Sequence, residues 1–426
     1  MKTKHFLLAS VLAAASASAM PLIRDANVTV SQAAPSEMIT VSYLLENEPA
    51  VVTCTVMTNG VDESGAPAWL PMTLANQKSI SGDVGLLVSQ GQHAIKFRPS
   101  KAGTWPDGAT ADFRFVLKAW PVSAPPDYMV VDAMGAERTR YYATSNDVPG
   151  GVTSDLYKTR KIVMRRVHAS GVEWISGEPV NASGEGGYAP RLLQIPVVLT
   201  NDYYIAIYEM TVQQASYAID GAAEKSTVEE ADMVSIGWSY NLMRGTSDGS
   251  WSGWPQDGHE VKPTSKFQAM RTRTGVQFDY PTQAQWEFAC RAGTTTSLNN
   301  GRNLRGGMYS PESLDEICWY YGNTNDAPRG AAAQVVGLLK PNAWGIYDMH
   351  GNRWEFCLDW FEKYTSQELR VEPVGNEESH ETYAGRVMRG GQYNNSAAVT
   401  ASGHRQNTSP DAYLAIRLWA PCIAVE

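Results

Sequence analysis

The stretch 342–361 (NAWGIYDMHGNRWEFCLDWF) gathers chemically versatile side chains around one short glycine turn. Asp348 and Glu355 supply carboxylates on either side of Gly351, and aromatic residues are interleaved with them. A merely buried strand needs no such mixture of glycine, carboxylates and aromatic rings. The stretch therefore has three interpretations, namely a catalytic site, a metal-stabilised scaffold or a ligand-binding face.

The cysteine content and the charge exclude several classes of site. The five cysteines are Cys54, Cys290, Cys318, Cys357 and Cys422, and none belongs to a CxxC pair. A zinc ribbon or a thioredoxin-type site is therefore not expected, and a small odd number of cysteines does not make a disulfide scaffold. The net charge of -9, without a run of Lys or Arg, argues against a nucleic-acid partner.

The first 19 residues predict a signal peptide. Two lysines precede an apolar run over residues 6–15, and the small residues 17–19 (Ala-Ser-Ala) suit signal peptidase. We expect cleavage after Ala19 and export to the periplasm, the cell surface or the medium of a bacterial cell. No other stretch reaches the ~18 apolar residues that a membrane span requires, so no span is expected.

Beyond the signal peptide, two domains joined by a linker are predicted. Residues 20–120 read as a β-sandwich of the immunoglobulin or fibronectin type, because short β-rich runs alternate with turns such as Asn59-Gly60. Prolines in AWPVSAPPDYMVV predict a Pro-rich linker over residues 121–150. Residues 151–426 form the second domain, in which glycine and tryptophan are frequent and helices are few.

Two helices are predicted in the second domain. One follows Thr282, which caps it while Gln285 reaches back to complete a capping box, and Gly293 ends it. The other covers TSKFQAMRTRTG and stops at Gly275.

Five stretches of the second domain occur in the order found in one enzyme family. They are YYIAIYEMTVQQASY (203–217), FDYPTQAQWEFACRAGTTT (278–296), PNAWGIYDMHGNRWEFCLDWF (341–361), RVMRGGQYNN (386–395) and HRQNTSPDAYLAIRL (404–418). Together they resemble the formylglycine-generating enzymes, also called sulfatase-modifying factors. The resemblance implies an α+β fold, a variant of the C-type lectin fold with little regular secondary structure.

The resemblance implies a copper chemistry that this sequence does not support. Formylglycine-generating enzymes oxidise a sulfatase cysteine with O2, using two cysteines that bind copper(I), a soft metal suited to thiolates. Those cysteines follow the RGG motif, whereas the loop from Arg389 to Thr408 contains none here. Gln392 stands where a serine is usual, and the closing Gly-Phe-Arg motif is Ala-Ile-Arg (415–417). Copper is therefore not expected, and iron is not expected because the histidines form no HxxxH or HxE cluster.

The resemblance also implies a structural Ca²⁺ in the stretch 342–361. The family binds this ion with a loop that matches Asp348, Gly351, Arg353 and Glu355, through two side chains and two backbone carbonyls. Hard oxygen ligands suit Ca²⁺. In the structural alternative, Asp348 caps a turn and Glu355 pairs with an arginine. Trp354 matches a tryptophan near the substrate groove and is expected in the aromatic core, with one edge open to that groove.

Cys290 matches a family cysteine whose disulfide partner falls in the altered loop. A buried thiol and a disulfide with another of the C-terminal cysteines both remain open.

Three functions are compatible with these observations. The first is a non-catalytic, exported ligand-binding protein, which the missing copper cysteines favour. The second is a formylglycine-generating-type oxidoreductase, with copper or non-haem iron, that acts on protein or small-molecule thiols. The third is a structural or cell-surface interaction protein whose β-sandwich is the functional part. No catalytic residue is predicted. For the first function, a peptide or carbohydrate ligand is expected to meet Trp354, Gln392, Tyr393, Asn394, Asn395, His404, Arg405 and Asn407.

Overall fold

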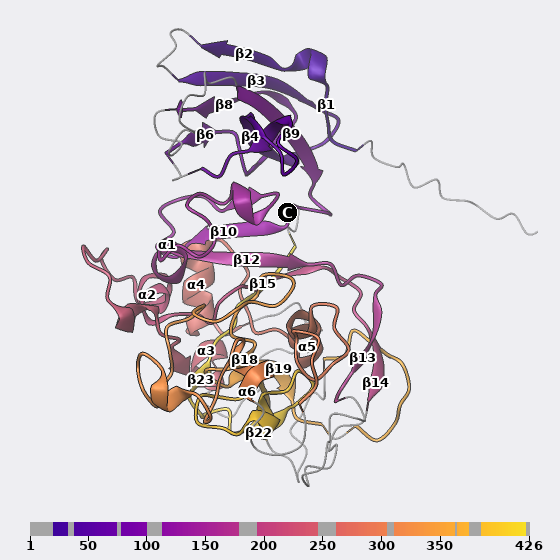
Figure 1. Ribbon diagram of the computed structural model, residues 1–426, viewed down its shortest axis with the longest axis vertical. Helices are drawn as coiled ribbons and strands as arrows, with labels where there is room; N and C mark the ends of the chain where they lie inside the picture. The colour runs from indigo at the N-terminus through magenta and orange to yellow at the C-terminus, as the bar shows by residue number, and fades with distance from the viewer. Residues whose placement is uncertain are drawn as a thin grey trace, which may run out of the picture.

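The computed structural model describes residues 20–32, 38–74, 78–99, 113–178, 194–245, 261–304, 311–362, 364–374 and 385–422. The predicted signal peptide, residues 1–19, lies outside these ranges. Figure 1 shows two parts, an N-terminal stack of β-sheets and a larger part that carries the labelled α-helices. Within the described ranges, no helix is long and apolar enough to cross a membrane.

The N-terminal part consists of two antiparallel sheets that face each other across one core. In β3, alternate residues are buried, and Val41, Tyr43 and Leu45 contribute to this core together with Val52 and Val56 of β4. The two sheets therefore form a β-sandwich; its immunoglobulin or fibronectin type stays a prediction. The first sheet contains β1 (Leu22–Ile23), β2 (Thr29–Gln32), β3 (Ile39–Glu46), β6 (Ile80–Gly82) and β8 (Gly91–Phe97). The second contains β4 (Ala50–Val61), β5 (Pro67–Pro71), β7 (Leu86–Val88) and β9 (Phe113–Pro121).

The predicted Pro-rich linker, residues 121–150, is not a spacer. It contributes β10 (Tyr128–Asp132) and β11 (Arg140–Tyr142), and β10 pairs along its whole length with β12 (Lys161–Val167). The prolines precede β10, and the apolar residues that follow them gain stability by packing in a sheet. The prolines therefore predicted a linker that was too long.

The same segment joins the two parts of the chain. The Tyr141 amide donates to the Gly85 carbonyl at 2.7 Å, and the Asp147 carboxylate accepts a hydrogen bond from the Thr55 hydroxyl at 3.1 Å. The backbones approach so closely that a Cβ on Gly85 would lie 2.7 Å from the Tyr141 carbonyl oxygen. A hydrogen-bonded interface therefore positions the β-sandwich on the larger part.

The larger part contains several sheets, and the one beside the β-sandwich in Figure 1 has the order β11-β10-β12-β15-β24. It includes β15 (Tyr203–Ala206) and β24 (Trp419–Pro421). Another has the order β16-β23-β19-β21-β22, built from β16 (Gly237–Trp238), β23 (Leu414–Ala415), β19 (Glu355–Trp360), β21 (Arg386–Arg389) and β22 (Gln406–Thr408). Smaller sheets join β13 (Glu173–Ser176), β14 (Ile195–Val198) and β20 (Arg370–Val371), and β17 (Cys318–Trp319) with β18 (His350–Gly351).

The helices of this part are short, and the two predicted ones are present. The capping box is confirmed, because the Thr282 hydroxyl accepts from the Gln285 amide while the Gln285 side chain accepts from the Thr282 amide. This helix ends at Ala292, in the left-handed region at φ 45°, rather than at Gly293. The α-helices are α1 (Leu156–Thr159), α2 (Val212–Ala215), α3 (Tyr240–Arg244), α4 (Lys266–Thr274), α5 (Gln283–Arg291) and α6 (Pro311–Leu314).

Helix α5 is buried along its whole length and packs against β19 and β21. Its Trp286 is fully buried in one core cluster, and Trp354, 6% exposed, belongs to another. Trp354 thus lies in the core, as predicted, whereas Trp344 and Trp360 are half-buried. The fold as a whole is α+β and rich in short strands, as predicted.

We predict that Gly85→Ala weakens the interface between the two parts. The new Cβ would meet the Tyr141 backbone, whereas Gly65→Ala is a matched control because Gly65 also has a positive φ but nothing within 4 Å. Left-handed backbone strain alone costs roughly 1–2 kcal/mol. Urea unfolding should therefore show a larger decrease in the free energy of unfolding for Gly85→Ala than for Gly65→Ala. Equal losses would contradict a tight backbone contact.

Candidate functional site

The turn predicted to do chemistry is held in an uncommon backbone conformation. Asp348, Gly351 and Asn352 all have positive φ, of 56°, 74° and 56°. Glycine is required at 351, because a Cβ there would lie 2.0 Å from the Trp319 carbonyl oxygen. The buried Asn352 side chain accepts from the Gln334 amide at 2.9 Å and donates to Glu209 at 2.5 Å. The surrounding chain therefore fixes the shape of the turn.

A buried ion pair lies beneath this turn. Glu355 and Arg417 are both 0% exposed, and Arg417 donates to the two carboxylate oxygens of Glu355 at 2.6–3.0 Å. The Trp286 indole N–H donates to the same carboxylate at 2.5 Å. The pair is well satisfied, because Arg417 also donates to the carbonyls of Ala206 and Tyr347. This arrangement matches the structural alternative for Glu355.

Two further carboxylates lie close to this ion pair. Glu209 is fully buried, and its Oε1 has no hydrogen-bond partner. Burial, followed by the charges of Glu355 and Asp348, raises the pKa of Glu209 well above 4.5. Burial likewise raises the pKa of Asp348 to about 6, although its Oδ2 accepts from the Gly337 amide. One arginine does not balance three carboxylates, and both the burial of Glu209 and its acidic neighbours therefore favour the protonated form of this group.

The predicted calcium shell fits these residues incompletely. Both oxygens of Glu355 are engaged by Arg417 and Trp286, so Glu355 serves the ion pair rather than an open metal site. In the described part of the chain, no group of three or more His, Cys, Asp or Glu side chains is arranged to hold a metal. The calcium site of Asp348, Gly351, Arg353 and Glu355 stays a prediction.

Most of the predicted ligand-binding residues gather around the turn. The Tyr393 amide donates to the Asn352 carbonyl at 3.0 Å, which fixes the Gln392–Asn395 segment beside the turn. On its other side, the His404 ring lies 6.1 Å from the Trp354 ring. The Asn394 side chain is exposed and accepts from the Gln392 amide group at 2.7 Å.

Arg405 is buried, unlike these half-buried or exposed residues, so its predicted ligand-binding role is corrected. It is 5% exposed, its guanidinium lies over the rings of Phe361 and Tyr364 at 4.8 and 4.0 Å, and it donates to Gln283. The side chain turns inward because aromatic faces and an amide oxygen satisfy it there. Asn407 in β22 is exposed, and its backbone pairs with Val387 of β21.

A second buried charge network anchors the loop after the RGG motif, and the sequence analysis missed it. Glu287 accepts from Arg291 at 2.9 Å and from Arg389 at 3.0 Å, and Arg389 also donates to the carbonyls of Ser402 and His404. Burial opposes the charge of Glu287, yet the two guanidinium groups hold its pKa below 4.5. The spacing of Glu287 and Arg291, four residues apart in a predicted helix, was the available signal.

The side chains of Arg353 and Tyr413 were not predicted to contact a ligand. The guanidinium of Arg353 lies near Gly237, where a Cβ would be 3.2 Å from Nη2 and 3.4 Å from the Tyr413 carbonyl carbon. Arg353 is half-buried and donates to the Ser235 carbonyl, whereas the Tyr413 side chain is 65% exposed. We call Arg353, Gln392, Tyr393, Asn394, His404 and Tyr413 the turn face.

All five cysteines are free, which answers the question left open for Cys290. Cys290, Cys318 and Cys357 are 0% exposed, and burial raises the pKa of each thiol, in Cys290 to about 12. The Cys290 sulfur lies 3.9 Å from Nε2 of His350, whose own pKa burial lowers to about 4. Both members of this pair are therefore neutral at pH 7.

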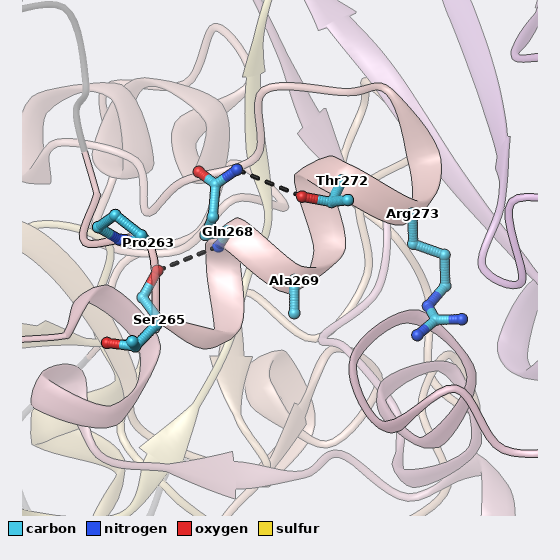
Figure 2. A pocket seen from close by; sticks show the side chains of 7 residues that line it. Pro263, Ser265, Gln268, Ala269, Thr272 and Arg273 are labelled. Atoms are coloured by element: carbon cyan, nitrogen blue, oxygen red, sulfur yellow. Dashed lines mark hydrogen bonds between the residues drawn. The ribbon is translucent and has the colours of Figure 1, made fainter.

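A hollow along α4 offers no competing site. Figure 2 shows it lined by residues 263–265 and by the side chains of Gln268, Ala269, Thr272 and Arg273. The Gln268 amide donates to the Thr272 hydroxyl at 3.3 Å, and Arg273 donates to the Ala218 carbonyl at 3.1 Å. None of the predicted site residues lines this hollow, and it holds no carboxylate or imidazole.

Comparison with protein families identifies the class of the larger part. Residues 193–415, more than half of the chain, match the Sulfatase-modifying factor enzyme 1-like domain. The chain therefore belongs to the sulfatase-modifying factor family, and the resemblance drawn from its motifs is confirmed.

Several curated proteins share part of this domain. The formylglycine-generating enzyme of Bos taurus is 33% identical over 141 residues, 32% of this chain and 35% of its own length. That of Streptomyces coelicolor is 34% identical over 118 residues, 26% of this chain and 35% of its own length. The chaperone protein LppX of Paenibacillus barcinonensis is 25% identical over 187 residues, 38% of this chain and 64% of its own length. The chain thus spans about a third of the length of these formylglycine-generating enzymes.

Two solved structures are similar to the chain. Treponema denticola variable protein 1 gives a TM-score of 0.42 at 20% identity, covering 61% of this chain and 95% of its own. PvdO from Pseudomonas aeruginosa gives a TM-score of 0.43 at 15% identity, covering 61% of this chain and 94% of its own.

We predict that Glu209→Gln makes the protein less sensitive to rising pH. Because the folded-state pKa of Glu209 is raised, its contribution to stability is complete below pH 4.5 and is lost as pH rises toward the folded-state value. The variant has no proton to lose, so its stability relative to wild type should be higher at pH 8 than at pH 5. Urea unfolding at both pH values measures this difference.

Glu287→Gln is the control for this experiment. The pKa of Glu287 is lowered, so this group is charged at both pH values and its removal should destabilise the fold at each. A constant difference between Glu209→Gln and wild type from pH 5 to pH 8 would show that Glu209 does not titrate in this range.

Proposed function

We propose that this chain is an exported member of its family that binds a ligand without forming formylglycine. The ligand is a peptide or a carbohydrate, and it contacts the turn face. Export rests on the signal peptide predicted in residues 1–19, and the lack of a basic run in the sequence keeps nucleic acid out of the proposed partners.

The state of the cysteines is the observation that supports the non-catalytic proposal. Copper(I) and thiol oxidation both need thiolates. No cysteine lies between Arg389 and Thr408. Cys290, Cys318 and Cys357 are fully buried, and burial raises the pKa of each thiol. Cys54 lies in the β-sandwich and is also buried, and burial raises the pKa of Cys422 to about 12. No thiol is thus accessible and readily ionised beside the turn face.

The chemistry of the turn face supports ligand binding. Tyr393 and Tyr413 present aromatic rings, Gln392 and Asn394 present amide donors and acceptors, and Arg353 presents a guanidinium group. Such a mixture suits the hydroxyls of a sugar or the backbone of a peptide. The backbone of the face is preorganised by the 348–352 turn and by the Arg389 contacts, which lowers the entropy lost when a ligand binds.

One observation favours the β-sandwich as a second candidate. Val61 at the end of β4 is 61% exposed, and the neighbouring Trp69 and Leu70 of β5 are 40% and 37% exposed. Exposed apolar residues that gather on one hairpin are typical of protein interaction surfaces. Variants of both surfaces are therefore compared in the binding experiment.

We predict that the purified protein does not make formylglycine. Incubation with copper(I), O2 and a CxPxR sulfatase peptide should give no aldehyde above a control without protein, because no accessible thiol is available to hold the metal. Mass spectrometry of the peptide measures the conversion. Aldehyde formation above the control would establish the oxidoreductase alternative.

We predict that Tyr393→Ala weakens ligand binding by about tenfold or more. An aromatic contact at the centre of an interface contributes about 1–2 kcal/mol, and 1.4 kcal/mol corresponds to a tenfold change in Kd. Glycan and peptide arrays identify a ligand for the full chain, and calorimetry then compares the variants. Trp69→Ala is the matched control and should bind like wild type. Loss of binding in Trp69→Ala with binding intact in Tyr393→Ala would move the function to the β-sandwich.

A further inference from the structure

Arg386, at the start of β21, lies against two aromatic rings. Its Cζ lies 3.7 Å from the centre of the Trp360 ring and 4.2 Å from that of Tyr240. The side chain is 4% exposed, and Nη1 donates to the Leu358 carbonyl at 2.9 Å. Both rings therefore contact the guanidinium, whose N–H donors lie in its own plane.

Among the residues that the structure describes, no carboxylate forms an ion pair with Arg386. Burial lowers its pKa to about 10, so the group remains charged at neutral pH. Asp279 and Asp359 act on it through space, but neither forms an ion pair with it. Asp279 pairs instead with Arg244 at 3.1 Å. A buried cation without a counterion is costly, so this position favours an anion.

Two donors of this residue pair also lack acceptors within the described part of the chain. Nε of Arg386 and Nε1 of Trp360 are both buried, and no described residue accepts a hydrogen bond from either. Buried donors are nearly always paired, and an unpaired one commonly marks an ion or a water molecule. The two residues face each other across the β19–β21 ladder, where Trp360 and Arg386 are paired in register.

We propose that Arg386 and Trp360 form a binding site for a carboxylate group. The planar guanidinium donates from Nε to one carboxylate oxygen, and the indole N–H of Trp360 provides the neighbouring donor. The low exposure of Arg386 limits the ligand to a small carboxylate, or to one carboxylate that projects from a larger molecule. This site shares no residue with the turn face, so its test does not depend on the proposed function.

The indole N–H of Trp360 reports directly on this site. In ¹H–¹⁵N spectra of the full chain, which has 13 tryptophans, Trp360→Phe identifies the signal of Trp360 by its disappearance. Acetate is then titrated against chloride at equal ionic strength. The Trp360 signal should move saturably with acetate and stay in place with chloride. Inorganic phosphate is a parallel arm, and a response to phosphate without a response to acetate would overturn the assignment to carboxylate.

Arg386→Lys tests the role of the guanidinium, because it keeps the charge but removes the planar set of donors. The saturable shift should be lost in this variant. Arg165→Lys is the matched control, since Arg165 also lies over an aromatic ring, Tyr128, but is paired with Asp127 at 2.8 Å. A saturable acetate shift that survives Arg386→Lys, or no selective shift in wild type, would overturn the proposal.

A thermal measurement covers the case in which Arg386→Lys fails to fold. Acetate should raise the Tm of wild type above that in chloride, and Trp360→Phe should reduce this gain while it keeps an aromatic ring over Arg386. An equal gain in wild type and Trp360→Phe would also overturn the proposal.

Discussion

The buried pair of Glu355 and Arg417 is the interaction on which the larger part most depends. Glu355 opens β19, and Arg417 follows β23, so the pair joins two segments 62 residues apart in sequence. Glu355 also accepts from Trp286 of α5, and Nη1 of Arg417, which is free of Glu355, donates to the Ala206 carbonyl at the end of β15. Breaking such a pair by removing one partner typically costs about 3–5 kcal/mol, because the other charge is left buried. The pair therefore holds together a helix and strands from different sheets.

Hydrogen bonds from this pair and from the neighbouring Glu209 also fix the backbone of the 348–352 turn. Arg417 contacts the Tyr347 carbonyl directly before Asp348, and Asn352 is fixed by Glu209. The left-handed backbone at Asp348 and Asn352 is tolerable because short polar side chains adopt it at small cost and these contacts compensate for the strain. This arrangement buries more carboxylates than arginines, which raises the pKa of Glu209 well above its usual range.

Local features of this fold could be predicted from the sequence, and long-range ones could not. The capping box at Thr282 depends on residues three positions apart, and the family motifs lie within short stretches, so both were recognised. The partner of Glu355 was left open as an unspecified arginine, since nothing local points to Arg417. Arg405 was assigned to the ligand-binding residues because a sequence does not show that Phe361 and Tyr364 meet its guanidinium inside the fold. The strand β10 was interpreted as part of a linker because prolines directly precede it.

The two buried charge networks separate the stability of the domain from the chemistry of its surface. Glu287 and Arg389 fix the carbonyls of Ser402 and His404, while Glu355 and Arg417 fix the turn beneath Tyr393. Neither network contains the half-buried side chain of Gln392 or the exposed side chains of Asn394 and Tyr413, so changes at those positions leave the buried ion pairs intact. The loop between Arg389 and Thr408 can therefore lack the family's cysteines while the scaffold that holds it is retained. The same physical separation makes a surface with altered binding chemistry compatible with an unchanged fold.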